Sequence, residues 1–403
     1  MHELANLQPG NEIKYRVIVN TSSSGLTRLT ARAESPCPAY LLASMRLVNV
    51  AEYESRAGEI AEGSTLDFYD GGSNDEITLR ENVAAFSRIT LYPRVFRGVG
   101  QRDLHTTILG VPVSTPVIVA PLALIGMLHP DGEIPVVRAA SNAGSIFTLS
   151  TFSVTPIEDV VAAADGSVWF QLYVYKDRSA SEALVRRVEA AGCTALELTA
   201  DTPLSGRRER DVRNNLTLPA DLWAPNLTAD GALPSPKSSG GKSPLAAAVE
   251  ELVDPNLTWD DIAWLTSISS LPVLIKGIVR ADDARRAVDA GAAGVIVSNH
   301  GGRQFDTAPA AIDALARVAD AVGDRAEVIL DGGIRRGADI VKAIAMGARA
   351  VQVGRPIVWG LVVDGEDGVR DVLGLLHDEL DLAMALAGCP SIDEISPDLL
   401  TPE

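Results

Sequence analysis

Eight short apolar runs are spread through residues 116–354, and amphipathic segments separate most of them. The runs are too apolar to leave one face in water, which is typical of strands buried on both faces of a parallel sheet. They lie at 116–120, 146–150, 168–174, 195–199, 272–276, 294–298, 327–331 and 350–354. In the segments between them, such as 281–290 and 311–322, apolar residues recur three and four positions apart, which predicts helices.

A recurring glycine supports this alternation. AAGCTALELT (190–199), DAGAAGVIVS (289–298) and AMGARAVQVG (345–354) place a glycine seven residues before the end of the run, and SNAGSIFTLS (141–150) places it six before. The pattern indicates a helix that ends at glycine, a short turn and a buried strand. Eight such units predict an α/β fold, the (β/α)8 TIM barrel. The alternative is a doubly wound open sheet, but no GxGxxG follows the first strand.

Three segments depart from the repeat. Residues 1–44 follow neither the helix nor the strand period, so we expect a poorly ordered N-terminal extension before a barrel domain at 45–403, with Met45 as an alternative start. Residues 46–96 predict two or three short helices. Residues 216–258, after the fourth strand, are rich in Pro, Gly and Ser, and we expect them to include a lid loop over the barrel mouth. A tolerated insertion without function is the alternative.

Composition limits the partners. A formal net charge of −18 disfavours nucleic acids and anionic membranes, which bind clustered Lys and Arg. No apolar run approaches the roughly 18 residues of a transmembrane helix. Cys37, Cys193 and Cys389 match no metal-ligand spacing, so we expect reduced cysteines and no metal site. These features predict a soluble, cytoplasmic protein.

Polar groups gather where the predicted strands end. In a (β/α)8 barrel the carboxyl ends of all strands meet at one face, and buried polar groups there need a partner, which suggests a ligand. The residues at these ends are Pro121, Leu122, Ala123, Ser150, Gln171, Tyr173, Thr199, Asp201, Lys276, Ser298, His300, Asp331, Gly354 and Arg355.

The last two strand ends predict a phosphate site. DGGIRRGADIVKAIAMGARAVQVGRP (331–356) runs from a strand through Gly332 and Gly333 to a helix, a strand and a Gly-Arg pair. Glycines permit close backbone approach, helix-start amides favour an anion, and Arg335 and Arg355 can neutralise it. Phosphate binding after strands seven and eight is a recurrent use of this fold.

The stretch SNHGGRQFD (298–306) follows the sixth strand and contains His300 and Arg303. Asp201 and Arg208, after the fourth strand, can reach the same barrel mouth. A histidine oriented by a carboxylate and flanked by two guanidiniums is suited to removing a proton from an anionic substrate. Three neighbouring arginines are instead expected on a solvated face, pairing with Glu209 and Asp211: Arg207, Arg210 and Arg213.

Together these motifs resemble the FMN-dependent α-hydroxy acid oxidase and dehydrogenase family, which includes glycolate, lactate and mandelate oxidases. The resemblance covers residues 46 to about 390 and also rests on TLRENVAAFSRITLYPR, WFQLYVYKDR, LTADTPLSGRRERD and VLIKGI, all in family order. It implies FMN as cofactor and oxidation of an (S)-2-hydroxy acid to a 2-oxo acid. Oxygen is the expected electron acceptor, giving hydrogen peroxide, and a homotetramer is the expected assembly.

The resemblance also implies individual roles. His300 matches the active-site base, Asp201 its carboxylate partner, and Tyr173 the tyrosine near the substrate hydroxyl. Arg208 and Arg303 match the pair that binds the substrate carboxylate. Lys276 matches the lysine beside flavin N1 and O2. The remaining flavin and phosphate contacts match Ala120, Pro121, Leu122, Ala123, Ser150, Gln171, Thr199, Ser298, Asp331, Gly332, Gly333, Arg335, Gly354 and Arg355.

One substrate-site position departs from the glycolate and lactate oxidase pattern. Phe68, in DFYDGGSND, stands where those enzymes have a tyrosine, and this favours a mandelate-like or medium-size 2-hydroxy acid. Three alternatives stay open: a dehydrogenase that passes electrons to a quinone or a protein, a non-redox FMN-dependent isomerase, and a flavin-binding relic without activity. The arginines disfavour the isomerase, because they suit a carboxylate.

Overall fold

A computed structural model describes residues 15–21, 27–33, 46–216, 224–227 and 244–400. The chain divides into two compact units, Met1–Leu47 and Val48–Glu403. In the first unit, β1 (Tyr15–Thr21) pairs antiparallel with β2 (Thr27–Ala33). The sequence pattern, which follows neither the helix nor the strand period, did not predict these two strands. Their period-two alternation is interrupted by the apolar run Val17–Val19, which conceals the strand pattern.

Eight parallel strands of the second unit close into a barrel, in which β12 pairs with β5. Each strand coincides with one of the eight predicted apolar runs, so the (β/α)8 barrel is confirmed. The strands are β5 (Val117–Val119), β6 (Ile146–Ser150), β7 (Val168–Leu172), β8 (Ala195–Thr199), β9 (Val273–Ile278), β10 (Gly294–Val297), β11 (Glu327–Asp331) and β12 (Ala350–Val353).

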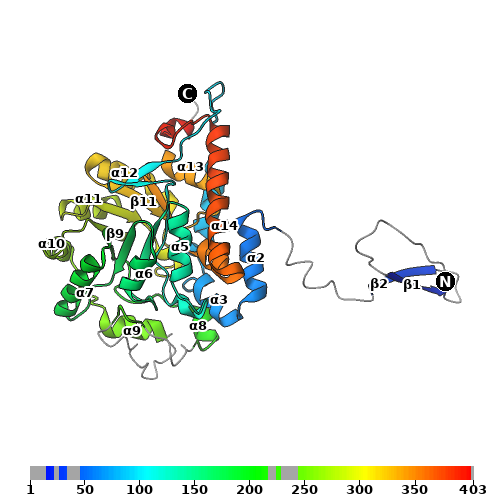
Figure 1. The fold of residues 1–403 in the computed structure, drawn as a ribbon, viewed down its shortest axis with the longest axis horizontal. Helices are drawn as coiled ribbons and strands as arrows, with labels where there is room; N and C mark the ends of the chain where they lie inside the picture. Colours follow the sequence, from blue (N-terminus) through cyan, green and yellow to red (C-terminus); the bar gives the residue numbers. More distant parts are fainter. Residues whose placement is uncertain (1–14, 22–26, 34–45, 217–223, 228–243, 401–403) are drawn as a thin grey trace. The chain divides into compact units, whose positions relative to one another are not determined.

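Helices alternate with these strands and surround the barrel (Figure 1). They are α5 (Ile134–Asn142), α6 (Ile157–Ala163), α7 (Arg178–Ala191), α10 (Trp259–Ile268), α11 (Ala281–Asp289), α12 (Ala311–Val322), α13 (Gly337–Ala345) and α14 (Arg355–Ala387). The predicted N-terminal helical segment comprises α2 (Val50–Ile60), α3 (Gly63–Asp70) and α4 (Ile77–Ala84), and α2 packs against α14. No helix in the described ranges is long and apolar enough to cross a membrane.

About half of the predicted lid segment, 216–258, lies outside the described residues, namely 217–223 and 228–243. Its described part includes α9 (Pro244–Leu252), while the short α8 (Glu209–Arg213) comes just before the segment. The 224–227 stretch is anchored to the barrel wall, because Asn226 accepts a hydrogen bond from the Ile157 amide at 3.1 Å.

The barrel interior consists of an apolar layer beneath a polar one. Ile118, Ile146, Trp169, Ala195, Leu274, Ile296, Ile329 and Ala350 form the apolar layer, together with Ile108 and Val113. The last two belong to the antiparallel hairpin β3 (Thr106–Ile108) and β4 (Val111–Val113). Side chains alternate along a strand, so the next inward position is two residues further on. These positions, which we call the polar layer, are Ala120, Thr148, Gln171, Glu197, Lys276, Ser298, Asp331 and Gln352.

Two glycines give a matched test of how α13 packs against α14. A Cβ built on Gly337 would lie 2.1 Å from the backbone carbon of Glu379, whereas nothing lies within 4 Å of a Cβ built on Gly374 in α14. We expect Gly337→Ala to destabilise the protein by about 1–3 kcal/mol through overpacking. Gly374→Ala should stabilise it by up to about 1 kcal/mol through helix propensity. Denaturant unfolding measures both, and equal midpoints would contradict this packing.

Candidate active site

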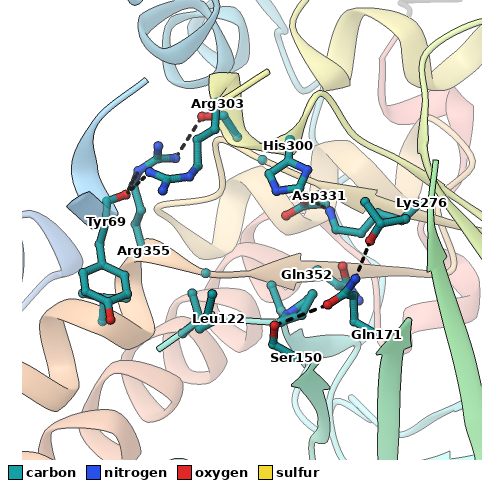
Figure 2. Close-up of a pocket in the computed structure, with 18 of the residues that line it drawn as sticks. Tyr69, Leu122, Ser150, Gln171, Lys276, His300, Arg303, Asp331, Gln352 and Arg355 are labelled. Atoms are coloured by element: carbon teal, nitrogen blue, oxygen red, sulfur yellow. Dashed lines mark hydrogen bonds and ion pairs between the residues drawn. The ribbon is translucent and has the colours of Figure 1, made fainter. Parts of the chain in front are cut away.

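One pocket opens at the carboxyl ends of the barrel strands and collects the predicted site residues (Figure 2). Every residue that the sequence predicted for the site lines this pocket except Asp201 and Ser298. Those two lie directly behind the lining, because Asp201 is hydrogen-bonded to His300 and Ser298 to Lys276. Val249 of α9 also lines the pocket, so the described part of the predicted lid segment reaches the site.

The His300 imidazole is held in one orientation by its neighbours. Its Nδ1 lies 2.8 Å from Asp201 Oδ1, and its backbone amide donates to Ser298 Oγ at 3.0 Å. The φ angle of His300 is 59°, in the left-handed region that a residue with a Cβ rarely adopts. Since Nδ1 faces the carboxylate, Nε2 is the nitrogen left to exchange a proton with a ligand.

Asp201 stays ionised at this position. Burial opposes its ionisation, but His300 and the more distant Lys276 hold the pKa of its carboxyl below the usual value. Thr202 adds a hydrogen bond to Oδ1 at 3.1 Å, and Oδ2 is buried without a partner among the described residues. A persistent carboxylate stabilises a protonated imidazole, as a general base requires.

Arg208, which is buried, and Arg303, which is half-buried, form a first pair of cations at the pocket that His300 lines. Arg303 donates to the backbone carbonyls of Tyr69 at 3.0 Å and Gly71 at 2.8 Å, and Arg208 Nε is buried without a partner in the described part of the chain. Burial lowers the pKa of both guanidiniums, and repulsion from Arg208 and Arg355 lowers that of Arg303 further, while the buried carboxyl of Asp211 opposes these shifts in part. An anionic ligand would relieve this unfavourable electrostatic energy.

Phe68 forms the apolar wall beneath this pair. The guanidinium carbon of Arg303 lies 5.5 Å from the centre of the Phe68 ring, and that of Arg208 lies 6.0 Å from it. The ring also packs edge-on against Tyr69, with ring centroids 4.8 Å apart. The site therefore presents two cations over an aromatic face, with no phenolic hydroxyl at this position.

Arg335 and Arg355 form a second pair of cations, at the start of α13 and of α14. Arg355 donates to the carbonyls of Tyr69 (Figure 2) and Gly71 at 3.2 Å each and of Gly301 at 3.0 Å. The guanidinium of Arg335 lies 4.7 Å above the Trp359 ring. Burial lowers the pKa of both side chains, and repulsion from Arg335 helps bring that of Arg355 to about 10. Two desolvated guanidiniums at helix starts suit a phosphate.

Lys276 occupies the wall of the pocket, within the polar layer. Its Nζ contacts Asp331 Oδ2 and donates to Ser298 Oγ at 2.9 Å, and Ser298 donates to the same Asp331 oxygen at 2.6 Å. Burial opposes its charge, but Asp331, Glu197 and Asp201 raise the pKa of Lys276 above the usual value. Lys276 therefore carries a fixed positive charge beside the pocket.

A chain of neutral polar groups continues from there along the pocket floor. Gln171 donates to Thr199 Oγ1 at 2.9 Å and accepts from Ser150 Oγ at 3.3 Å (Figure 2). These groups offer both donors and acceptors to a planar heterocycle.

Sequence reasoning placed one arginine wrongly and missed several site residues. Arg210 does not belong to a solvated face, because it donates to Glu76 at 2.7 Å and to Asp67 at 3.1 Å, joining α3 and α4 to α8. Arg207 and Arg213 are exposed and pair with Glu209, as predicted, whereas the predicted partner Asp211 is buried and its charge acts on Arg208 and Arg303 instead. Of the missed residues, Tyr69 offers its backbone carbonyl, for which the sequence carries no signal. Glu197 and Gln352 were detectable as lone polar residues within apolar runs.

Comparisons with known proteins show which family the chain belongs to. Residues 57–402 match the family model described as FMN-dependent dehydrogenase. Glycolate oxidase 3 of Oryza sativa subsp. indica is 48% identical over 352 residues, 87% of this chain and 95% of that protein. L-lactate oxidase of Nostoc sp. is 47% identical over 357 residues, 88% of this chain and 98% of that protein. A crystal structure of mandelate oxidase with (S)-4-hydroxymandelic acid has a TM-score of 0.83 and 42% identity, covering 87% and 97% of the two chains.

Fold and site define a (β/α)8-barrel protein whose strand-end pocket suits a phosphate-bearing cofactor and a second anion. The chain belongs to the family of FMN-dependent dehydrogenases, and its cofactor is FMN. The residues present fit this cofactor. Arg335 and Arg355 lack an anionic hydrogen-bond partner in the described residues, as a phosphate site requires, and Lys276 and Gln171 supply polar groups for the flavin ring.

The second arginine pair gives a test of cofactor binding. Arg335→Met keeps the aliphatic stem over Trp359 but removes the charge, so FMN affinity should fall by about 1.5–3 kcal/mol, the range for a hydrogen bond to a charged group. The adjacent Arg336, which pairs with Glu379 at 2.6 Å, is the control. Loss of this exposed ion pair should lower stability by about 0–1 kcal/mol and should remove no contact with the cofactor. Flavin fluorescence titration compares Arg335→Met with Arg336→Met; equal affinities would exclude Arg335 from the cofactor site.

Proposed function

We propose that this protein oxidises an (S)-2-hydroxy acid to the 2-oxo acid and passes the electrons to oxygen, which gives hydrogen peroxide. The similar proteins named glycolate oxidase, L-lactate oxidase and mandelate oxidase support this reaction. The observation that carries it is the His300–Asp201 pair beside Arg208 and Arg303, which form no ion pair with a carboxylate among the described residues, although the charge of Asp211 acts on both.

Each group near His300 has a role in this reaction. Arg208 and Arg303 bind the substrate carboxylate, which places the α-carbon and its hydroxyl beside His300 and Tyr173. His300 Nε2 takes one proton from the substrate, and ionised Asp201 stabilises the imidazolium that forms. Burial and the charge of Asp201 raise the pKa of Tyr173 to about 12, so its phenol stays neutral and donates a hydrogen bond to the substrate.

The cofactor would lie across the remaining strand ends. Arg335, Arg355 and the Gly332–Gly333 turn would hold its phosphate, and the backbone from Ala120 to Ala123 would lie against the ring. Lys276, with Gln171, Ser150 and Thr199, would contact the pyrimidine edge, where a cation favours electron acceptance. Bound FMN supplies the two-electron acceptor of the reaction.

A bulky or aromatic substrate side chain fits this pocket better than a methyl group. Phe68 is an apolar ring at the position where glycolate and lactate oxidases have a tyrosine. Phe152 packs against Tyr173 with ring centroids 5.6 Å apart. Leu122 and Val249 add further apolar surface to the lining. These contacts favour a mandelate-like acid over lactate or glycolate, because apolar walls gain most from burying apolar area.

Anaerobic mixing with glycolate, lactate, 2-hydroxyoctanoate and mandelate tests the reaction, with loss of flavin absorbance as the readout. We expect fastest reduction by mandelate or 2-hydroxyoctanoate, and peroxide formation when air is admitted. Reduction followed by slow reaction with air would instead indicate a quinone or protein acceptor. No reduction by any of these acids would refute the proposed function.

His300 can be tested separately from cofactor binding. His300→Asn keeps a residue that tolerates positive φ, so FMN should be retained while flavin reduction slows by about 10²–10⁴-fold, the usual contribution of general base catalysis. His105→Asn, on the exposed surface beside Asp103, is the control. Stopped-flow reduction within tenfold of the unsubstituted protein would remove His300 from the mechanism.

Phe68→Tyr tests the substrate preference. For a small acid, the added hydroxyl lies near the carboxylate and should improve binding by up to about 1.5 kcal/mol. For a bulky acid, it must be desolvated without a partner, so nothing is gained and affinity falls. We predict the second outcome for mandelate. Steady-state kcat/KM for lactate and mandelate decides, and an unsubstituted enzyme that already prefers lactate, with a further gain in the variant, would overturn the prediction.

A further inference from the structure

Glu197 is a buried carboxyl that the proposed reaction does not use. It lies on β8, its side chain belongs to the polar layer, and it is fully buried. Its Oε2 accepts a hydrogen bond from Gln352 Nε2 at 2.6 Å, across the barrel on β12. Among the described residues, Glu197 Oε1 and Gln352 Oε1 both lack a partner. A buried acid with one oxygen unsatisfied is costly, so its presence needs a reason.

A single proton would satisfy both unpaired oxygens. If Glu197 Oε1 is protonated, it can donate to Gln352 Oε1 while Oε2 continues to accept from the amide nitrogen. The two side chains would then form a carboxylic acid–amide pair with two hydrogen bonds. The ionised form can make only the bond from Gln352 Nε2, and it leaves both Oε1 atoms without a hydrogen-bond partner among the described residues. The pair therefore has two arrangements that differ by one proton.

The surroundings place the titration of Glu197 in the physiological range. Burial raises the pKa of Glu197 to about 7, while the positive charge of Lys276 opposes this rise. The charged groups that act on it are Lys276 on β9, Asp331 on β11 and Asp201 beyond β8. The polar-layer positions of the other strands are uncharged: Ala120, Thr148, Gln171, Ser298 and Gln352.

Both neighbours of Glu197 reach the pocket. Gln352 and Lys276 line it, whereas Glu197 lies beneath them (Figure 2 shows the two lining residues). When the cofactor accepts electrons, negative charge is added beside Lys276. This charge offsets part of the positive potential that favours ionised Glu197, so its affinity for a proton rises.

We propose that Glu197 is a positioning residue that binds one proton from solvent when the bound FMN is reduced. Gln352, at the pocket floor, then accepts a second hydrogen bond from Glu197. The new bond is the O–H bond of Glu197, and no electrons pass through the residue. The added proton offsets negative charge near Lys276 and makes reduction easier. This inference rests on the proposed location of Lys276 beside the flavin ring.

The midpoint potential of bound FMN, measured against pH with a chemical reductant, tests the proposal without any hydroxy acid. Below pH 7 Glu197 is already protonated and adds nothing. Between about pH 7 and the higher pKa that Glu197 has beside reduced FMN, the potential should fall more steeply, by about 30 mV per pH unit for one extra proton in a two-electron couple. Glu197→Gln should lose the extra slope, whereas Thr148→Val, an isosteric change in the same layer, should keep it. The same slope in Glu197→Gln as in the unsubstituted protein would overturn the proposal.

Infrared difference spectra of the unsubstituted protein keep the test decisive if Glu197→Gln does not fold. Reduction at pH 8 should create the carbonyl band of a protonated acid that shifts with ¹³C-glutamate labelling but not with ¹³C-aspartate. Absence of that band would refute the proton uptake. Lys276→Met distinguishes a failure of proton uptake by Glu197 from a failure of the proposed cofactor placement. An unchanged midpoint potential in Lys276→Met would mean that Lys276 does not face the flavin.

Discussion

The desolvation of positive charge at the barrel mouth is the constraint on which the rest of the site depends. Closing eight strands into a barrel brings their carboxyl ends together, so Lys276 and Arg208 become buried, and Arg303, Arg335 and Arg355 half-buried, around one pocket. Lys276 is compensated by Asp331, whereas Arg303 and Arg355 reach only backbone carbonyls within the described structure. Anions bound at the two proposed sites would complete the compensation, and ligand binding would then be coupled to local stability.

The carbonyls that hold these arginines come from the N-terminal helices, which gives that segment a role in the site. Tyr69 and Gly71 lie at the end of α3, where free carbonyls carry the negative end of the helix dipole. One carbonyl pair thus orients Arg303 of the first pair and Arg355 of the second. The positions of the two proposed anion sites are therefore set together, although their arginines come from distant parts of the sequence.

The sequence was sufficient for the fold and for most of the pocket because both depend on local signals. Apolar runs located all eight strands, and polar residues at their ends located His300, Lys276 and Arg355. Contacts across the barrel could not be predicted in the same way. The Glu197–Gln352 pair depends on two strands far apart in sequence, and Arg210 depends on a partner 134 residues away. Nothing in the local pattern carries such pairings.

In the proposed reaction, Arg208 and Arg303 bind the substrate carboxylate and so place the α-carbon beside His300. The most direct measurement compares anaerobic flavin reduction by mandelate and lactate with reduction by their neutral amides. The amides keep the α-hydroxyl and α-hydrogen but lack the charge. Flavin reduction should be at least about tenfold slower with each amide than with its acid, because the amide loses one charge-assisted hydrogen bond to the arginines. Equal rates for acids and amides would contradict it.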